Sequence, residues 1–599
     1  MSNISRMRFY LFRDSRTCEK RPLLQLSSFS SLAVVMEIGR NLRRLCWFHI
    51  LPYWRTFVVF LTPILLLPVP LIGTQEALTG YVVVIMAVYW MTEALPLPIT
   101  SLLPIIAFPL LGIMNTGQVC MNYFSETVVM FIGGLMVGLA VEYSNLHKRI
   151  ALRVLMLVGT DPKWLMMGFM SVTMLLSMFV SNTGACAMIC PIVEALVQEL
   201  FHKNSQENEG EDKTQLTAEE NQVVREEFAD DDDDGRSRRA RRVRVTLLLS
   251  IAYSANIGGT GTLIGSTPQL ALKGIVEELY GEDNDLSFSS WMLVLMPAVL
   301  ISTALTWVWL QFLLSGFKCQ KQIENGVKSQ SARVKNLIRT KYQELGPTSF
   351  NEKTILFLFP VLVMLWMFRD PKFIAGWGSL FSKKIGDSVP VLLIILILFI
   401  LPIKPDFWCF RSAGSENERP KASPAMLTWE FMHEKLPWGL VLLLGSGFAL
   451  SDASKISGLS KWLGHQLAAL QVLPPFSILI ICCMLTTWMT EIVSNTATAN
   501  IVLPILAQMA DTIHVNPLYL MIPAAATCCY TFVLPVGTPA NAIVYNSARM
   551  KPLDMVKAGI VTKMMSVLIL CVVMETIGRG IFPVNIIESS LNANNSTSL

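Results

Sequence analysis

The sequence predicts an all-α polytopic membrane protein with about 11 transmembrane helices and two re-entrant helical hairpins, arranged as two inverted repeats. Three observations support this prediction. Hydrophobic residues make up 52% of the 599 residues and charged residues only 15%, whereas soluble chains carry about 25% charged residues. The mean hydropathy is +0.49. Finally, one polar tripeptide occurs twice, each time inside a long apolar stretch. A string of soluble domains is therefore excluded.

The apolar runs give the order of the elements. A membrane crossing needs roughly 20 apolar residues, and runs of that kind lie near 56–73, 78–95, 99–113, 127–155, 244–275, 288–315, 353–368, 388–403, 437–465, 516–547 and 556–583. Two further stretches, 163–201 and 472–512, are each long enough to enter the bilayer twice and are interrupted by polar residues. Such interruptions are tolerated only where they line a cavity inside the protein, so we expect two re-entrant hairpins.

Loop charge predicts the orientation and the organisation of the chain. Lys and Arg cluster in 1–55, a cytoplasmic N-terminal segment, in 203–244, a disordered cytoplasmic loop, and in 316–350, a cytoplasmic linker. Loops 114–126 and 276–287 have none, as expected for the opposite side. The membrane parts are then 56–202 with the first hairpin, 245–315 completing the first repeat, and 351–585 as the second repeat. The tail 586–599 would be extracellular, with Asn594 and Asn595 as glycosylation acceptors.

An internal repeat relates the two hairpins. Ser181-Asn182-Thr183 and Ser494-Asn495-Thr496 lie 313 residues apart, and each is followed at the same distance by Pro-Ile. Later, Gly265–Gln269 and Gly537–Asn541 both interrupt an apolar run. Five crossings separate the repeats in the predicted topology, so they are inverted. Inverted repeats with broken helices are the architecture of secondary transporters, and the paired interruptions indicate the binding site.

The interruptions offer hydroxyl, amide and backbone groups that can bind an anion and a small hard cation. The windows 177–193, 254–272, 492–510 and 530–548 contain no Lys or Arg, so a bound dianion would need a cation, Na⁺ or H⁺, as compensation. For a single motif the alternative is a packing or kink role, which the duplication disfavours. The intramembrane acids Glu93, Glu194, Asp452 and Glu491 are further candidates, with structural support and ion coordination both open for Glu491. No catalytic motif occurs, so an enzyme is not expected.

Several motifs resemble those of the divalent-anion/sodium symporter superfamily, namely the animal carrier family 13 of sodium–dicarboxylate, citrate and sulfate transporters, which includes the insect "I'm not dead yet" carriers. The resemblance covers about 36–583. It rests on Tyr89–Pro96, Asn145–Leu152, Ser177–Thr183, Leu442–Leu450, both Ser-Asn-Thr motifs and Thr538–Val544.

This resemblance implies a homodimer in which an elevator-type transport domain carrying both hairpins moves against a scaffold. The substrate site it implies comprises Ser181, Asn182, Thr183, Ser446, Ser494, Asn495 and Thr496. It implies one Na⁺ site at Ser177, Ser181, Asn182 and the carbonyl of Thr267, and a second at Thr490, Val493, Asn495 and Gly537. The chain departs from the family pattern at Gly184, Gln269 and Ser446, which affects the first cation site and substrate selectivity.

We therefore expect a multi-pass plasma-membrane carrier, with its N-terminus cytoplasmic, that transports di- and tricarboxylates such as succinate and citrate with Na⁺ as coupling ion. Its partners would be these anions, the lipid bilayer and a second copy of the chain. The net charge of +4 is spread over separate loops, so no nucleic acid is expected. Cation-independent exchange and sodium–sulfate symport are the open alternatives. An anion channel is disfavoured, because it would need a continuous pore lined by polar or basic residues.

Overall fold

The computed structural model describes residues 53–159, 161–201, 235–281, 284–315, 335–371, 375–404, 423–467, 473–582 and 584. Residues 61–599 form one compact unit, and residues 1–60 are a separate one. In the described ranges the chain is helical, and its one β-bridge joins Pro402 to Ala425. The all-α prediction is thus confirmed. The N-terminal segment 1–52 and the acceptors Asn594 and Asn595 lie outside the described residues.

Six helical segments are long and apolar enough to cross a membrane in the described ranges. The first half contains α2 (Trp54–Leu65), a 3₁₀ turn (Pro70–Ile72), α3 (Gln75–Thr92), α4 (Leu97–Thr100), α5 (Leu103–Leu110), α6 (Thr116–Asn122), α7 (Glu126–Tyr143), α8 (Leu146–Val158), α9 (Pro162–Ser177), α10 (Asn182–Phe201), α12 (Gly235–Gly258), α13 (Thr267–Tyr280) and α14 (Phe288–Ser315).

The second half contains α16 (Phe350–Met367), a 3₁₀ turn (Trp377–Leu380), α17 (Ser388–Ile400), α18 (Trp429–Lys435), α19 (Trp438–Ser457), α20 (Leu459–Leu467), α21 (Pro475–Met489), α22 (Asn495–Thr512), α23 (Pro517–Thr527), α24 (Pro539–Ala548), α25 (Pro552–Val573), a π-helical turn (Met574–Gly578) and α26 (Arg579–Ile581).

The repeat is visible in backbone bends at equivalent positions. The predicted spans 127–155 and 437–465 are each two helices, α7 with α8 and α19 with α20. The bends fall at Asn145, with φ 58°, and at Gly458, with φ 81°, and these residues are 313 positions apart. A left-handed residue ends a helix by redirecting the chain, so both repeats turn at the same point.

Both predicted hairpins are present as helix–turn–helix pairs, α9 with α10 and α21 with α22. The runs 244–275 and 516–547 are broken helices, as the sequence indicated. The first break separates α12 from α13 at residues 259–266, and the second separates α23 from α24 at residues 528–538.

Two segments differ from the prediction. The run at 99–113 forms two short helices, α4 and α5, instead of one span, and Pro104 lies in the first turn of α5. Proline lacks the N–H of a continuing helix, so it fits where a helix starts afresh. Residues 235–244, assigned to the disordered loop 203–244, open α12. Their Arg and Ala residues are good helix formers, and the apolar sequence that follows extends the same helix.

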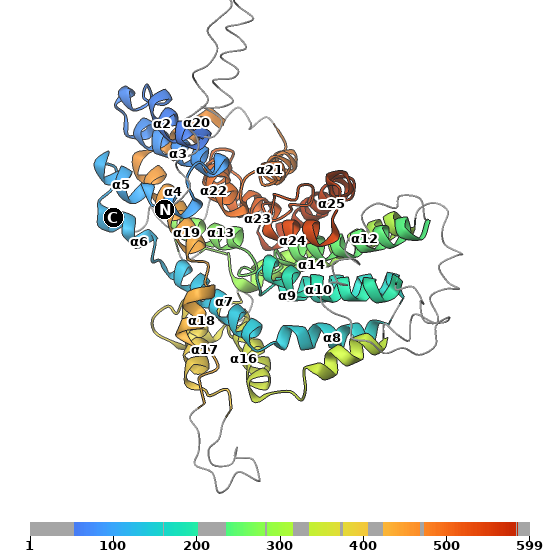
Figure 1. Cartoon of the computed structure of the whole chain (residues 1–599). Coiled ribbons are helices and arrows are strands. Elements are labelled where there is room, and N and C mark those ends of the chain that lie inside the picture. Colours follow the sequence, from blue (N-terminus) through green and yellow to red (C-terminus); the bar gives the residue numbers. More distant parts are fainter. Residues whose placement is uncertain are drawn as a thin grey trace, which may run out of the picture. The chain divides into compact units, whose positions relative to one another are not determined.

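The halves pack crosswise, which brings the two hairpin tips together. The first hairpin, α9 and α10, lies against α12 of its own half, and α10 also packs on α24 of the second half (Figure 1). The second hairpin helix α22 packs on α23 of its own half and on α13 of the first. Each hairpin is therefore held by a broken helix from both repeats.

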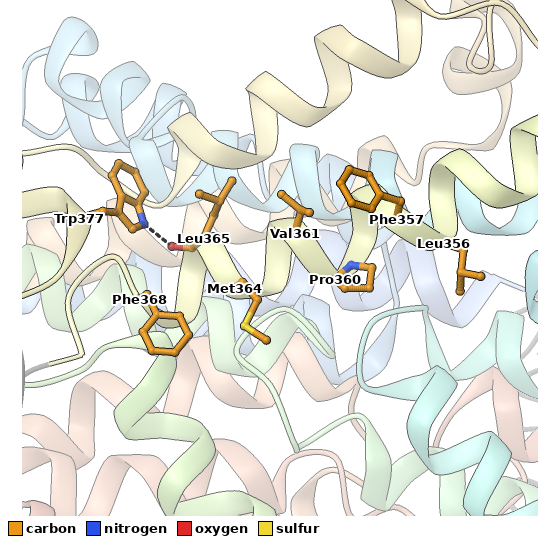
Figure 2. Close-up of a pocket in the computed structure, with 8 residues that line it drawn as sticks. All are labelled: Leu356, Phe357, Pro360, Val361, Met364, Leu365, Phe368 and Trp377. Carbon is orange, nitrogen blue, oxygen red and sulfur yellow. Dashed lines mark hydrogen bonds between the residues drawn. The ribbon is translucent and has the colours of Figure 1, made fainter.

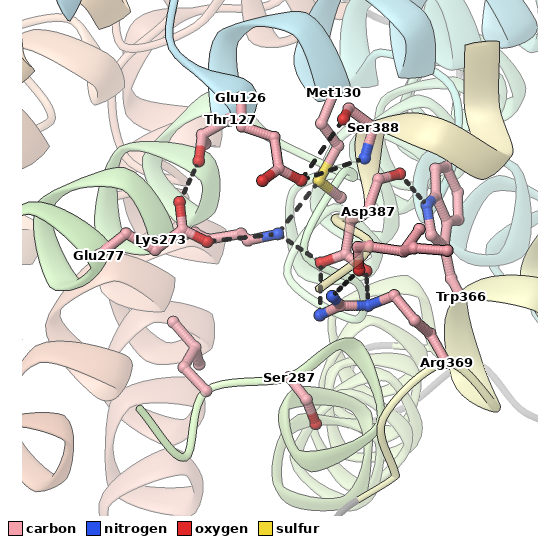
Figure 3. Close-up of polar contacts among 12 residues, drawn as sticks. Glu126, Thr127, Met130, Lys273, Glu277, Ser287, Trp366, Arg369, Asp387 and Ser388 are labelled. Atoms are coloured by element: carbon pink, nitrogen blue, oxygen red, sulfur yellow. Dashed lines mark hydrogen bonds and ion pairs between the residues drawn. The ribbon is translucent and has the colours of Figure 1, made fainter. Parts of the chain in front are cut away.

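A buried charge cluster anchors α13, the helix that follows the first break (Figure 3). The Lys273 ammonium forms an ion pair with the buried Asp387 carboxylate and lies 3.6 Å from Glu277. The Nε atom of Arg369 lies 2.6 Å from Oδ1 of Asp387. The hydroxyl of Thr127, on α7, donates to Glu277. The cluster thus ties α13 to α7 and to the start of α17.

The cluster keeps Asp387 ionised. Burial alone would raise the pKa of the Asp387 carboxyl, but the neighbouring charges of Lys273 and Arg369 outweigh burial and hold that pKa below its ordinary value. A carboxyl with a depressed pKa stabilises the fold above its unfolded-state pKa and loses that contribution only as the pH falls through the lower, folded value. The contribution of Asp387 to the free energy of unfolding is therefore constant near neutral pH.

We predict that Asp387→Asn lowers the free energy of unfolding by about 3–5 kcal/mol, because it removes the buried carboxylate that Lys273 and Arg369 share and leaves Lys273 with the more distant Glu277 alone. Thermal unfolding of the purified protein in detergent measures the change. Glu344→Gln is the matched control, since Glu344 and Lys341 form an exposed ion pair and its loss should cost at most about 1 kcal/mol. Equal effects of the two variants would show that the cluster is not an anchor.

Candidate functional site

The tip of the first hairpin places three oxygen atoms together. Ser177 is the last residue of α9 and Asn182 is the first residue of α10. The Ser177 hydroxyl lies 2.5 Å from Oδ1 of Asn182. The same hydroxyl lies 2.7 Å from the carbonyl oxygen of Ala255, in the last turn of α12. The tip therefore meets its own broken helix just before the break.

The tip of the second hairpin repeats this geometry. The Thr490 hydroxyl lies 2.9 Å from Oδ1 of Asn495 and 2.7 Å from the carbonyl oxygen of Cys528. Thr490 and Asn495 are each 313 residues beyond Ser177 and Asn182, so the two sets are equivalent members of the repeat. Both predicted pairs of hydroxyl and amide are brought together by the structure.

An amide chain connects the first tip to the second break. Nδ2 of Asn182 lies 3.4 Å from Oδ1 of Asn256, and Nδ2 of Asn256 donates to Oδ1 of Asn541 at 3.2 Å. Asn256 and Asn541 also both donate to the carbonyl of Thr531, at 2.7 and 2.9 Å. The two breaks are thus bonded to each other through buried side chains.

A second connection runs the other way. The hydroxyls of Thr267, the first residue of α13, and Thr496, in the first turn of α22, are hydrogen bonded. The second tip is therefore attached to the first half's broken helix. Together with the amide chain, this contact links the two tips through the broken helices.

The serines of the two motifs cap helices. The Ser181 hydroxyl accepts a hydrogen bond from the Gly184 N–H at 3.1 Å, and the Ser494 hydroxyl accepts one from the Ala497 N–H at 3.3 Å. This is the usual role of serine at a helix N-terminus. Thr183, the third residue of the first motif, is half-buried.

The remaining predicted residues lie around the tips in different ways. Ser446 is buried in α19, and its hydroxyl bonds the Leu443 carbonyl of its own helix at 2.8 Å. Val493 is buried directly before the second motif. Gly537 closes the second break, where a Cβ would lie 3.1 Å from Oε2 of Glu491. The described hydroxyl contact of Ser446 thus stays within its own helix, as do the capping contacts of Ser181 and Ser494.

The donor sets suit a hard cation. Each tip offers a hydroxyl, an amide oxygen and a backbone carbonyl, and hard cations prefer oxygen ligands. Gln269, a departure from the family pattern, lies in the first turn of α13 and donates to the Gly259 carbonyl of the first break. Its buried Oε1 has no hydrogen-bond partner among the described residues, so an unsatisfied acceptor lies next to this break. The residues present fit Na⁺.

The sequence did not predict two residues that lie near the tips, Asn256 and Lys563. Asn256 lies in a largely apolar run, and a polar amide in such a run is the signal that could have identified it. Lys563, on α25, lies far from the second motif in sequence, yet its Nζ reaches Glu491 at 2.7 Å. The windows 492–510 and 530–548 contain no Lys or Arg, but the fold brings a lysine from another helix to the second break.

The four candidate acidic residues have different surroundings in the structure. Glu491 accepts backbone N–H groups of the second break, which supports a structural role. Away from the tips, Glu194 pairs with Arg244 at 3.4 Å, Asp452 accepts from Asn122 at 3.3 Å, and Glu93 is an exposed left-handed residue at the end of α3.

An apolar groove lies elsewhere, along α16 (Figure 2). It has a volume of about 400 Å³ and is lined by Leu356, Phe357, Pro360, Val361, Met364, Leu365, Phe368 and Trp377. The indole N–H of Trp377 already donates to the Leu365 carbonyl at 2.7 Å. With its lining groups apolar or already bonded, this groove is unsuited to a small dianion.

Comparison with known proteins gives the family. Residues 50–583 match the family model described as "Sodium:sulfate symporter transmembrane region". The chain is 38% identical over 541 residues to "Protein I'm not dead yet" of Drosophila melanogaster, covering 89% of this chain and 90% of that protein.

Two mammalian relatives are similarly close. The chain is 39% identical over 560 residues to "Na(+)/dicarboxylate cotransporter 3" of Rattus norvegicus, covering 88% of this chain and 92% of the relative. It is 39% identical over 549 residues to "Na(+)/citrate cotransporter" of Mus musculus, covering 88% and 96%. Since the family model and these relatives span almost the whole chain, the protein belongs to the sodium:sulfate symporter family, within its carrier family 13 branch.

Proposed function

We propose that the protein is a secondary active transporter that carries di- and tricarboxylates, such as succinate and citrate, across the plasma membrane together with Na⁺. The observation that carries the proposal is the pair of equivalent hairpin tips, joined by Asn182–Asn256–Asn541 and by Thr267–Thr496. The relatives named for dicarboxylate and citrate cotransport give the substrate class.

The tips would bind the substrate through side-chain amides and hydroxyls. Asn182, Thr183, Asn495 and Thr496 offer donors to carboxylate oxygens, and the starts of α10 and α22 add backbone N–H groups and the positive ends of helix dipoles. Two tips related by the repeat suit an anion with two carboxylates, because each tip can hold one end. Sulfate, with its charge concentrated on one centre, would use the symmetry less well.

Na⁺ would supply positive charge next to the substrate. At the first tip Ser177, Asn182 and the Ala255 carbonyl would hold it, and at the second tip Thr490, Asn495 and the Cys528 carbonyl are the matching oxygens. These residues also position the amides, so a bound cation and the substrate would order the same tip. This shared ordering is the physical basis we propose for coupling.

Family membership supports the remaining parts of the proposal. We propose a homodimer whose hairpins and broken helices move as an elevator against a scaffold, with the N-terminus cytoplasmic and the C-terminal tail extracellular. Cation-independent exchange of the same anions is the alternative function, because the chain departs from the family pattern at Gly184, in the first turn of α10, and at Gln269, in the first turn of α13.

Labelled succinate, citrate and sulfate uptake into proteoliposomes tests the function. We expect saturable uptake of the carboxylates driven by an inward Na⁺ gradient, with choline as the control cation. Uptake that needs internal substrate but no Na⁺ would establish exchange instead. A non-saturating current would contradict the carrier proposal.

The site is tested by Asn182→Ala and Asn495→Ala. Asn182→Ala removes the amide that bonds Ser177 and Asn256, and Asn495→Ala removes the amide oxygen that accepts from Thr490. A buried polar group left without its partner costs about 1–3 kcal/mol, so each variant should reduce succinate uptake by about 5- to 150-fold. Surface biotinylation corrects for expression. Asn115→Ala is the matched control, because Asn115 is exposed at the start of α6 and should keep wild-type uptake. Wild-type uptake in either tip variant would remove these residues from the site.

A further inference from the structure

The two breaks differ in charge although they are equivalent in geometry. The second break contains a buried ion pair, in which Nζ of Lys563 lies 2.7 Å from Oε1 of Glu491 and both side chains are at most 2% exposed. Among the described residues the first break and its tip take part in no ion pair. The position equivalent to Glu491 in the first half is Met178, whose carbonyl accepts from the Thr262 hydroxyl.

Glu491 satisfies the backbone of the second break. Oε1 accepts from the N–H groups of Phe532 and Val533, each at 3.0 Å, and Oε2 accepts from that of Leu534 at 2.9 Å. Three N–H donors thus converge on one carboxyl group. These donors are occupied, so they are not available to an anionic substrate. The second break therefore holds a buried acidic side chain that its own backbone surrounds.

A buried carboxylate needs a positive charge close by, because its desolvation is costly. Lys563 supplies this charge from α25, which packs against α21 of the second hairpin. Its ammonium also donates to the Thr487 carbonyl at 2.6 Å and lies 4.7 Å from the centre of the Trp488 ring. A carboxylate, a carbonyl and an aromatic face therefore surround it, so the ammonium is held in place.

Glu491 connects the Lys563 ammonium to the second tip. Glu491 directly follows Thr490, whose hydroxyl belongs to the oxygen set of the second tip. If Glu491 were uncompensated, its charge would attract a cation to those oxygens. With Lys563 in place, the attraction is cancelled and a further cation would meet like charge.

We propose that Lys563 is a resident cation that replaces a mobile coupling cation at the second tip, so that Na⁺ binding is confined to the first tip. The inference rests on the proposed function and narrows it: of the two equivalent oxygen sets that could hold Na⁺, only that of the first tip would bind it. Lys563 acts here as a specificity-determining residue through Glu491, without touching the substrate.

The test titrates Na⁺ against the purified protein and against transport. Lys563→Gln removes the ammonium, and Lys557→Gln is the matched control, because Lys557 is exposed on the same helix. Thermal unfolding is measured in NaCl and in choline chloride at equal ionic strength, and succinate uptake is measured as a function of Na⁺. A bound ion raises the melting temperature by mass action.

We expect Lys563→Gln to gain Na⁺-specific stabilisation beyond that of the wild type, and its uptake to depend more steeply on Na⁺. Lys557→Gln should match the wild type in both measurements. The double variant Glu491→Gln/Lys563→Gln removes both charges and should return to the wild-type Na⁺ dependence. A Lys563→Gln protein that is stable only in Na⁺ would support the proposal in the strongest form.

Three results would overturn the inference: an unchanged Na⁺ dependence in Lys563→Gln, an equally increased dependence in the double variant, or a Lys563→Gln protein that no Na⁺ concentration stabilises while the double variant folds. None of these depends on whether the substrate is a carboxylate. Failure of the proposed function would appear separately, as absence of carboxylate uptake by the wild type, and the melting measurements would still decide the role of Lys563.

Discussion

Satisfying the backbone at two interrupted helices is the constraint on which the rest of the structure depends. Where α12 and α23 end inside the protein, N–H and C=O groups lose their helical partners, and no lipid can replace them. The second tip supplies such a partner, since the Thr490 hydroxyl bonds the Cys528 carbonyl. At the first tip the Ser177 hydroxyl adds a second bond to the Ala255 carbonyl, which also accepts from the Gly259 N–H. The groups that repair the backbone are thus the same groups that form the candidate site.

The crosswise packing follows from the same constraint. Each break is bonded to the opposite repeat, through Asn256 and Asn541 in one direction and Thr267 and Thr496 in the other. A displacement of one half would therefore disturb the oxygen set of the other. The repeat then diverges at one position, where Glu491 and Lys563 occupy the second break with a charge pair. Duplication explains the common geometry, and this pair makes the two halves chemically different.

Much of this could be predicted from the sequence, because the repeat itself carries information. Asn182 and Asn495 are separated by the same 313 residues as the Pro-Ile pairs that follow them, and this shared offset predicted two equivalent tips. Gly265 and Gly537 predicted the breaks. The bends at Asn145 and Gly458 were missed although polar residues flank both, in 142–149 and 451–461. Hydropathy averaged over a window of about 20 residues joins the two helices on either side of each bend into one run. The role of Lys563 could not be predicted for another reason. Its contact with Glu491 depends on how α25 packs against α21, and a local sequence pattern does not predict the packing of distant helices.

Binding of a dianion between the two tips is what we propose. It can be tested with an experimental density map of the full chain in lipid nanodiscs, with succinate and Na⁺ present. We expect substrate density between the side chains of Asn182 and Asn495, with its carboxylates toward the starts of α10 and α22. Density in the apolar groove of α16, or at any position that leaves both asparagines without contact, would contradict it.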